Sequence, residues 1–281
     1  PTIFLPAGPM LRGNYKGKFL GSGSDGWKYW DELRAGNISN KDWEEVETGI
    51  ARSYGHCMTM GTASTMTAIA ETLGLCLPGA SSIPAADSNH IRMSIEVGKR
   101  IVNMVWEDLR PSKIITEKSV DNAVTVAMAM GCSTNAIIHL IAMSRRAGIN
   151  LTMNDLDKKG REVPLIANIR PSGNNYLMED FYYAGGVPVV IKRLIEKNLL
   201  NNNSITANGK TIYENNKNAK CWNDDVIKNF EKPLVNDGGI KILRGNIAPD
   251  GAIIKPSAAT PELMKHKGKA VVFESVEEFH E

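Results

Sequence analysis

The sequence has no long apolar run and no stretch typical of a secretory signal. None of its hydrophobic segments approaches the roughly 18 residues that a membrane-spanning helix needs. The opening residues, PTIFLPAGPM, lack the basic stretch followed by an apolar stretch that marks a signal peptide. These absences predict a cytoplasmic protein without a membrane partner.

Cysteine is scarce, and neither sign of charge dominates. The 281 residues contain four cysteines, Cys57, Cys76, Cys132 and Cys221, with no C-x-x-C pair, which excludes a disulfide framework and a dithiol or zinc centre of that type. Thirty-three basic and 31 acidic residues give a net charge of +2, and the basic residues are scattered. Nucleic acid is therefore not an expected partner. The hydrophobic content of 42% suffices for the core of one domain and part of another.

The spacing of apolar residues predicts a helix-rich chain. Apolar side chains recur at helical intervals, and glycines stand where several of these patterns end. Ser119 is expected to cap one helix. The expected helices are 62–74, 91–109, 119–131, 133–148 and 188–199.

The remaining segments predict strands, a surface loop and a domain boundary. The short apolar run 163–168 is expected to be a buried strand, and the Asn-rich tract 201–218 a surface excursion. Beyond Lys232, short β-type runs alternate with Gly, Pro and Asp. We therefore expect an α/β fold with a boundary near residue 230, between a helix-rich α/β domain (1–230) and the beginning of a β-rich domain (231–281).

Cys57 lies in GHCMTMGTASTM (55–66), just before an expected helix. Free cysteine is among the most buried residue types, so the residues alone favour core packing. The exposed N–H groups of a helix N-terminus also favour a thiolate, the form that attacks substrates or binds metals. A third interpretation pairs Cys57 with His56, or with another histidine, in a thiol-nucleophile enzyme. Core packing, metal ligand and nucleophile all remain open at this point.

The stretch GCSTNAIIHLIA (131–142) places Ser133, Thr134 and Asn135 at the start of a helix. Their short polar side chains could bind a carboxylate or phosphate of a substrate there, or could simply cap the helix. The glycine-rich segments YYAGG and GSGSDG lack the strand-then-helix setting of a nucleotide-binding loop. A nucleotide site is not indicated.

Four separated blocks resemble the dihydroxy-acid and phosphogluconate dehydratase family, in the same order and spacing along nearly the whole chain. The blocks are GHCMTMGTASTMTAIAETLGLCLPG, GCSTNAIIHLIA, VPLIANIRPSGNNYLMEDFYYAGGVP and GNIAPDGAIIKPSA. The segment LPGASSIPAADSNHIRMS is more similar to the arabinonate and xylonate dehydratases, the sugar-acid branch, than to the branch of branched-chain amino-acid synthesis.

The resemblance implies a hydro-lyase that converts a 2,3-dihydroxy acid, such as a pentonate, to its 2-keto-3-deoxy acid. It implies an iron–sulfur cluster, commonly [2Fe–2S], and Mg²⁺ as cofactors. By resemblance Cys57 is one of three cysteine ligands of that cluster, which reverses the expectation of core packing. The same resemblance implies that 1–230 belongs to a cluster-binding domain and that 231–281 begins a β-barrel-like domain.

Important parts of the family pattern do not occur in this sequence. The Cys-Asp-Lys motif, with a cluster cysteine and a Mg²⁺ ligand, is expected upstream of residue 1, and the catalytic serine beyond Glu281. We therefore expect a central fragment of a longer polypeptide, inactive by itself because one cysteine cannot hold a cluster.

Two further expectations follow from the resemblance. An alternative substrate is the dihydroxy acid of branched-chain amino-acid biosynthesis. The full-length protein is expected to form a homodimer or homotetramer.

Overall fold

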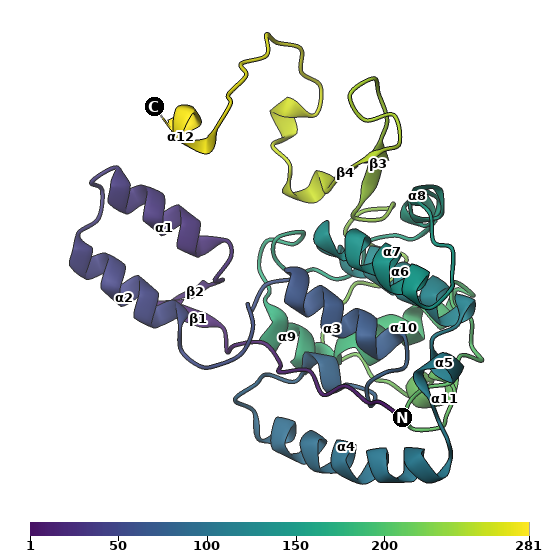
Figure 1. The fold of residues 1–281 in the computed structure, drawn as a ribbon. Coiled ribbons are helices and arrows are strands. Elements are labelled where there is room, and N and C mark those ends of the chain that lie inside the picture. Colours follow the sequence, from purple (N-terminus) through teal and green to yellow (C-terminus); the bar gives the residue numbers. More distant parts are fainter. Residues whose placement is uncertain (281) are drawn as a thin grey trace.

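The computed structural model describes residues 1–280 and contains a helical body with two projecting parts (Figure 1). The α1–α2 hairpin extends to one side of the body, and the C-terminal segment arches above it. The longest helix, α4 (Ser88–Trp106), lies along the opposite edge. None of the helices in the described part of the chain is long and apolar enough to cross a membrane.

One two-stranded ladder precedes the helices α1 to α11, and a second ladder follows them. Their bounds are β1 Gly13–Tyr15, β2 Lys18–Leu20, α1 Asp25–Arg34, α2 Asn40–Ile50, α3 Thr62–Thr72, η1 Ala80–Ser82, α4 Ser88–Trp106, α5 Pro111–Ile114, α6 Glu117–Met130, α7 Asn135–Arg146, α8 Met153–Glu162, α9 Met178–Ala184, α10 Gly186–Glu196, α11 Ile212–Asn216, β3 Lys241–Leu243, β4 Ala252–Ile254, η2 Pro256–Ala258, η3 Pro261–Leu263 and α12 Val276–His280.

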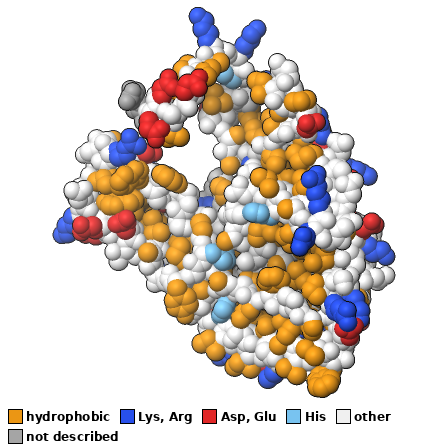
Figure 2. Space-filling view, viewed as in Figure 1, with side chains coloured by type: hydrophobic (Ala, Val, Ile, Leu, Met, Phe, Trp, Pro, Cys, Tyr) orange, Lys and Arg blue, Asp and Glu red, His pale blue; other side chains and the backbone are white. Residues whose placement is uncertain are grey.

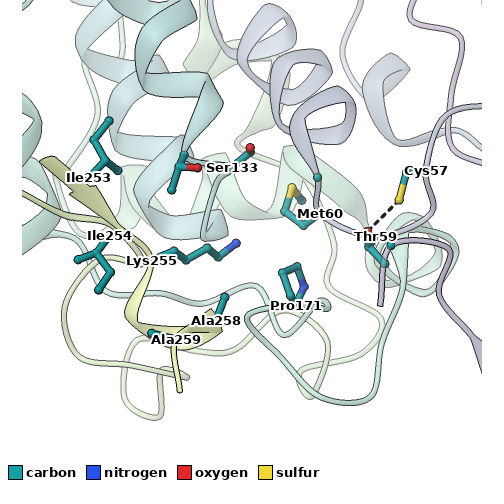
Figure 3. Close-up of a pocket in the computed structure, with 13 residues that line it drawn as sticks. Cys57, Thr59, Met60, Ser133, Pro171, Ile253, Ile254, Lys255, Ala258 and Ala259 are labelled. Carbon is teal, nitrogen blue, oxygen red and sulfur yellow. Dashed lines mark hydrogen bonds between the residues drawn. The ribbon is translucent and has the colours of Figure 1, made fainter. Parts of the chain in front are cut away.

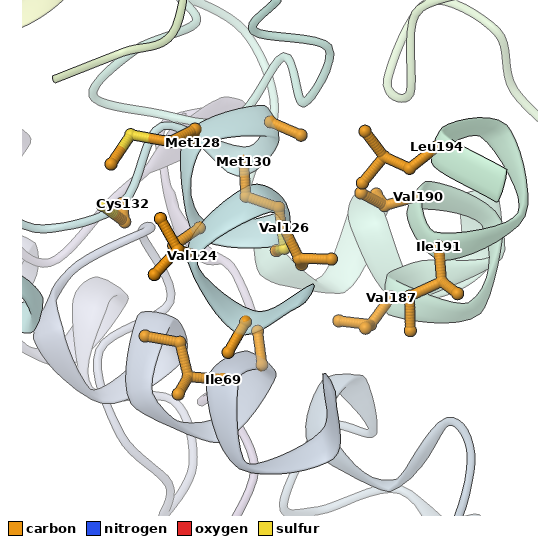
Figure 4. Close-up of a cluster of buried hydrophobic side chains, with 14 of the residues drawn as sticks. Ile69, Val124, Val126, Met128, Met130, Cys132, Val187, Val190, Ile191 and Leu194 are labelled. Atoms are coloured by element: carbon orange, nitrogen blue, oxygen red, sulfur yellow. The ribbon is translucent and has the colours of Figure 1, made fainter. Parts of the chain in front are cut away.

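Helix α6 is the centre of the hydrophobic core. Eleven of its 14 residues are buried, and it packs between α3 and α10 (Figure 4). Ile69 of α3 and Leu194 of α10 face it from its two sides. A helix that is buried on most of its surface is stable only when other elements surround it, which explains its central place.

The expected helix boundaries are confirmed to within a few residues, but one cap differs. Gly74, Gly131 and Gly148 follow helices with positive φ angles of 91°, 64° and 78°. Ser119 is not the N-cap of α6. Thr116 is the cap, and Ser119 is the third helical residue, whose side chain completes a capping box with Thr116.

The α/β class is confirmed, although the β content is small. Strands β1 and β2 pair antiparallel, as do β3 and β4, and residues 1–280 contain no closed barrel. The predicted strand 163–168 is wrong: this buried segment makes only single bridges, from Leu165 to Val235 and from Ala167 to Ile227. Two different segments each pair with it at one position, so no continuous ladder forms.

Two other segments differ from expectation. The tract 201–218 packs onto the body instead of forming an excursion, because Asn122 on α6 donates to the carbonyl of Asn201 at 3.0 Å and accepts from its N–H at 2.7 Å. The β-type run 269–275 forms no strand and is exposed.

One face of α4 is apolar and exposed. Ile91, Ile95, Val102 and Val105 are 53–67% exposed, and Gly98 lies between them. Hydrophobic side chains occur among polar ones along this lower edge of the molecule in Figure 2. We call these five residues the α4 stripe.

Candidate functional site

Cys57, Ser133 and Thr134 line one cavity of about 570 Å³, although 76 residues separate the cysteine from the serine in sequence (Figure 3). The loops before α3 and α7, and the segment after β4, form its walls. In Figure 2 the molecule is hollowed between the α1–α2 hairpin and the body. The lining residues are Gly23, Cys57, Thr59, Met60, Gly61, Ser133, Thr134, Pro171, Ile253, Ile254, Lys255, Ala258 and Ala259.

The Cys57 loop is held by backbone hydrogen bonds on both sides of the cysteine. The N–H of His56 donates to the carbonyl of Gly8 at 2.9 Å, and the N–H of Met60 donates to the carbonyl of Arg170 at 2.8 Å. Helix α3 starts at Thr62, immediately after this loop. The position of the thiol therefore depends on segments from three distant parts of the chain.

The sulfur of Cys57 has polar neighbours and is half-buried. Its Sγ lies 2.8 Å from the Ser22 hydroxyl and 2.9 Å from the Thr59 hydroxyl. A Cβ added at Gly23 would lie 3.6 Å from the sulfur, so this glycine leaves room beside it. Hydroxyl groups can donate hydrogen bonds to a thiolate, and this setting differs from that of a cysteine packed among apolar side chains.

His56 does not activate Cys57. Its Nδ1 lies 3.0 Å from the backbone carbonyl of Cys57, and its Nε2 is buried without a hydrogen-bond partner among residues 1–280. Burial lowers the pKa of His56. A base that activates a thiol must contact the sulfur, so this geometry does not support the thiol-nucleophile interpretation.

The other three cysteines differ from Cys57. Burial raises the pKa of Cys76 and of Cys132, the latter to about 12, and both thiols belong to the core. Cys221 is half-buried, and burial also raises the pKa of its thiol. None of the three lines the cavity. Core packing describes Cys76 and Cys132.

Hydroxyl groups tie the start of α7 to α3. The Ser133 N–H donates to the Thr65 hydroxyl at 3.0 Å, and the Ser133 hydroxyl lies 3.0 Å from that of Thr62. Asn135 does not line the cavity; its side-chain amide donates to Thr62 at 3.0 Å. The Thr134 side chain makes no capping bond. Capping alone therefore does not account for Thr134, which lines the cavity.

Sequence reasoning missed Lys255. This residue follows β4, and its ammonium group reaches the cavity and donates to the carbonyl of Gly131 at 2.6 Å. Burial lowers its pKa. A lysine directly after the apolar run AII and before a proline was the available signal, because a charged side chain that is partly buried beside apolar residues needs a partner.

The cavity supplies one ligand of the kind that an iron–sulfur cluster needs, but its lining does not form a magnesium site. Cys57 supplies one thiolate donor, with space and hydroxyl groups around the sulfur. The described residues contain no group of three or more His, Cys, Asp or Glu side chains able to hold a metal, and no carboxylate lines the cavity. Mg²⁺ prefers carboxylate and water oxygens, so these residues do not make its site.

Two family profiles cover the chain. The profile of the dihydroxy-acid/6-phosphogluconate dehydratase N-terminal domain matches residues 1–215, and that of the C-terminal domain matches residues 225–281. The boundary predicted near residue 230 stays a prediction.

Curated relatives resemble the chain along its whole length. It is 48% identical over 279 residues to an L-arabinonate dehydratase of Rhizobium leguminosarum bv. trifolii, covering 99% of this chain and 48% of the relative. It is 47% identical over 280 residues to a 6-deoxy-6-sulfo-D-gluconate dehydratase of Pseudomonas putida, with 99% and 48% coverage. A dihydroxy-acid dehydratase of Acetivibrio thermocellus is 39% identical over 275 residues, with 98% and 49% coverage.

The chain thus spans about half the length of the curated relatives it matches. The N-terminal profile alone covers more than two thirds of its residues. On these matches, the chain belongs to the dihydroxy-acid/6-phosphogluconate dehydratase family.

Proposed function

We propose that the full-length protein is a hydro-lyase that converts a sugar acid, such as a pentonate, to its 2-keto-3-deoxy acid. The C2–H and C3–O bonds break, water leaves, and the enol takes up a proton at C3 to become the ketone. The observation that carries this proposal is the cavity that combines the Cys57 thiol with the Ser133 and Thr134 hydroxyls, in a chain of this family.

The identities of the relatives support a sugar acid as the substrate. Relatives named for sugar acids share 47–48% of their residues with this chain, whereas dihydroxy-acid dehydratases share 39–41%. The alternative substrate is the dihydroxy acid of branched-chain amino-acid synthesis. The full-length protein should turn over L-arabinonate faster than 2,3-dihydroxy-3-methylbutanoate, and the reverse preference would exclude the sugar-acid assignment.

An iron–sulfur cluster, [2Fe–2S] or another type, would supply Lewis-acid chemistry at the departing 3-hydroxyl, and Mg²⁺ would acidify the C2 proton of the bound acid. Within this chain Cys57 would be one cluster ligand. Its neighbours Ser22 and Thr59 would orient the sulfur through their hydroxyl groups. Ser133 and Thr134 would hydrogen-bond the hydroxyl groups of the acid. We assign no proton-abstracting group to this chain.

The 281 residues alone are expected to be inactive. Clusters of this kind are held by several thiolates, and the other three cysteines lie away from the cavity. The isolated chain should therefore bind no stoichiometric iron after anaerobic reconstitution with iron and sulfide. A reconstituted chain with a stable cluster would contradict this expectation.

Iron and sulfide analysis of the anaerobically purified full-length protein tests the proposed ligand. We expect Cys57→Ser to lose most of the iron and sulfide that the wild-type protein contains, because serine does not replace thiolate as a soft ligand. Cys221→Ser is the matched control, since Cys221 is also half-buried but lies outside the cavity. Equal cluster content in both variants would reject Cys57 as a ligand.

We also propose that the full-length protein self-associates through the α4 stripe. Ile91 and Val105 lie seven residues on either side of Gly98, and Ile95 and Val102 lie three and four residues from it. Two antiparallel copies related by a two-fold axis at Gly98 would therefore match apolar residues with apolar residues. A Cβ at Gly98 would have no neighbour within 4 Å, so a second helix could approach closely.

A further inference from the structure

Lys255 is a half-buried cation without a carboxylate partner. No Asp or Glu oxygen lies within 4.0 Å of its ammonium group among residues 1–280. Its one hydrogen bond in the same region goes to the carbonyl of Gly131, at 2.6 Å. An ammonium group has three N–H donors, so two are free to bind something else.

Lys255 faces a cavity whose lining carries no acidic side chain. The cavity is lined by apolar side chains, hydroxyl groups and the Cys57 thiol, with no acidic residue. Taking a cation out of water is costly unless an anion or several acceptors compensate, and one carbonyl compensates only in part. This site would bind an anion more readily than a neutral molecule.

The ammonium group also points to the place where a substrate would bind. In Figure 3 the Lys255 nitrogen extends into the cavity between Ser133 and Pro171, toward Met60. Ser133 lies on one side of it, the Cys57 loop lies beyond Met60, and Thr134 lines the same cavity. A small acid held at Lys255 would have its hydroxyl-bearing carbons within the same cavity as the thiol.

We propose that Lys255 binds the carboxylate of the acid substrate, so that the segment after β4 completes the binding site formed by the loops before α3 and α7. This inference rests on the proposed function for the identity of the acid, but the carboxylate subsite can be tested separately. It makes Lys255 a substrate-binding residue and assigns it no role in proton transfer.

A purely structural role is the competing explanation. Gly131 is the C-cap of α6, and a cation near the C-terminal carbonyls of a helix is favourable. If Lys255 only caps α6, its loss would lower the unfolding temperature and leave ligand affinity unchanged. Ligand affinity is therefore the decisive measurement.

Lactate is a suitable probe for the full-length protein. It carries a carboxylate and a 2-hydroxyl but has no 3-hydroxyl to lose, so it is not a substrate of the proposed reaction. Its dissociation constant can be measured by ligand-observed NMR, beside propane-1,2-diol as the neutral analogue and inorganic phosphate as another anion. Wild-type protein should bind lactate and should bind propane-1,2-diol much more weakly. Phosphate bound as tightly as lactate would reject a carboxylate-specific subsite.

Substitutions at Lys255 separate the effect of its charge on ligand binding from an effect on folding. Lys255→Met and Lys255→Gln should weaken lactate binding by about 10- to 100-fold, because a charge-assisted hydrogen bond is lost, and should raise KM for L-arabinonate more than they lower kcat. Lys255→Arg keeps the charge and should restore most of the affinity. Lys241→Met is the matched control, since Lys241 lies on the adjacent strand β3 and pairs with Asp237 outside the cavity.

The outcomes distinguish this inference from the proposed function. Unchanged lactate affinity and KM in folded Lys255→Gln would overturn the carboxylate role, even if the wild type dehydrates L-arabinonate. Lactate binding that depends on Lys255, in a wild-type protein that dehydrates no sugar acid, would support the subsite and reject the function. Should Lys255→Met and Lys255→Gln both fail to fold, a Lys255→Arg variant with wild-type stability and no lactate affinity would also refute the inference.

Discussion

Replacing the buried Glu71 by glutamine should destabilise the protein by about 2–4 kcal/mol at pH 5. Glu71 lies near the end of α3, the helix that starts beside the cavity. Its Oε1 accepts from the Gly79 N–H at 2.7 Å, and its Oε2 accepts from the N–H and hydroxyl of Ser81 at 2.9 and 2.5 Å. Glutamine keeps one of the two carboxyl oxygens and replaces the other by an NH₂ group, which cannot accept a hydrogen bond from a backbone N–H. The cost combines about 1 kcal/mol for each lost bond with an unpaired buried donor.

The size of this effect should depend on pH. Burial raises the pKa of Glu71 above its ordinary value of 4.5. The folded protein therefore keeps the proton to higher pH than the unfolded chain. The stability from Glu71 is complete below about pH 4.5 and decreases as the pH rises through the folded-state pKa. Glutamine does not titrate, so the difference in stability between wild type and Glu71→Gln should shrink as the pH rises through the folded-state pKa of Glu71.

Equilibrium urea unfolding, followed by far-ultraviolet circular dichroism at several pH values, measures both effects. Glu47→Gln on α2 is the matched control, because Glu47 is exposed and its replacement should change the stability by less than about 0.5 kcal/mol. A loss of stability in Glu71→Gln that does not vary with pH would refute the role of burial. A loss as small as that of the control would refute the hydrogen-bond reasoning.

Two further substitutions test the core and the α4 stripe. Gly131→Ala should lower the free energy of unfolding by about 2–4 kcal/mol, because φ is +64° and the new Cβ would lie 2.6 Å from the Ser172 hydroxyl. Gly148→Ala is the control: its φ is +78° but the new Cβ has no neighbour within 4 Å, so the loss should be only about 1–2 kcal/mol. Equal losses of stability in urea unfolding would contradict the steric argument. Val102→Asp should shift the full-length protein to a smaller species in sedimentation velocity, whereas Val271→Asp, in an exposed C-terminal segment, should not; an unchanged assembly in both would exclude this interface.

Local signals in the sequence were sufficient for most helices. Glycines with positive φ end α6 and follow α3 and α7 within two residues, and helical spacing predicted each of these elements. Local signals were insufficient where long-range contacts decide the conformation. The run 163–168 has strand composition, but its partners Val235 and Ile227 each supply only one bridge. The Asn-rich tract is polar, yet Asn122 on α6 binds its residues Asn201 and Ser204 to the body.

The sequence by itself identified the family, the helical framework and Cys57 as a candidate site residue, because these depend on residue order and short-range spacing. Only the tertiary structure decided what surrounds the thiol. It brought Ser133 and Lys255 to the same cavity and directed His56 toward a backbone carbonyl instead of the sulfur. The physical reason is that Cys57, Ser133 and Lys255 lie 76 and 122 residues apart in sequence. Their meeting in one cavity depends on the packing of α3, α6 and α7 and not on any local pattern.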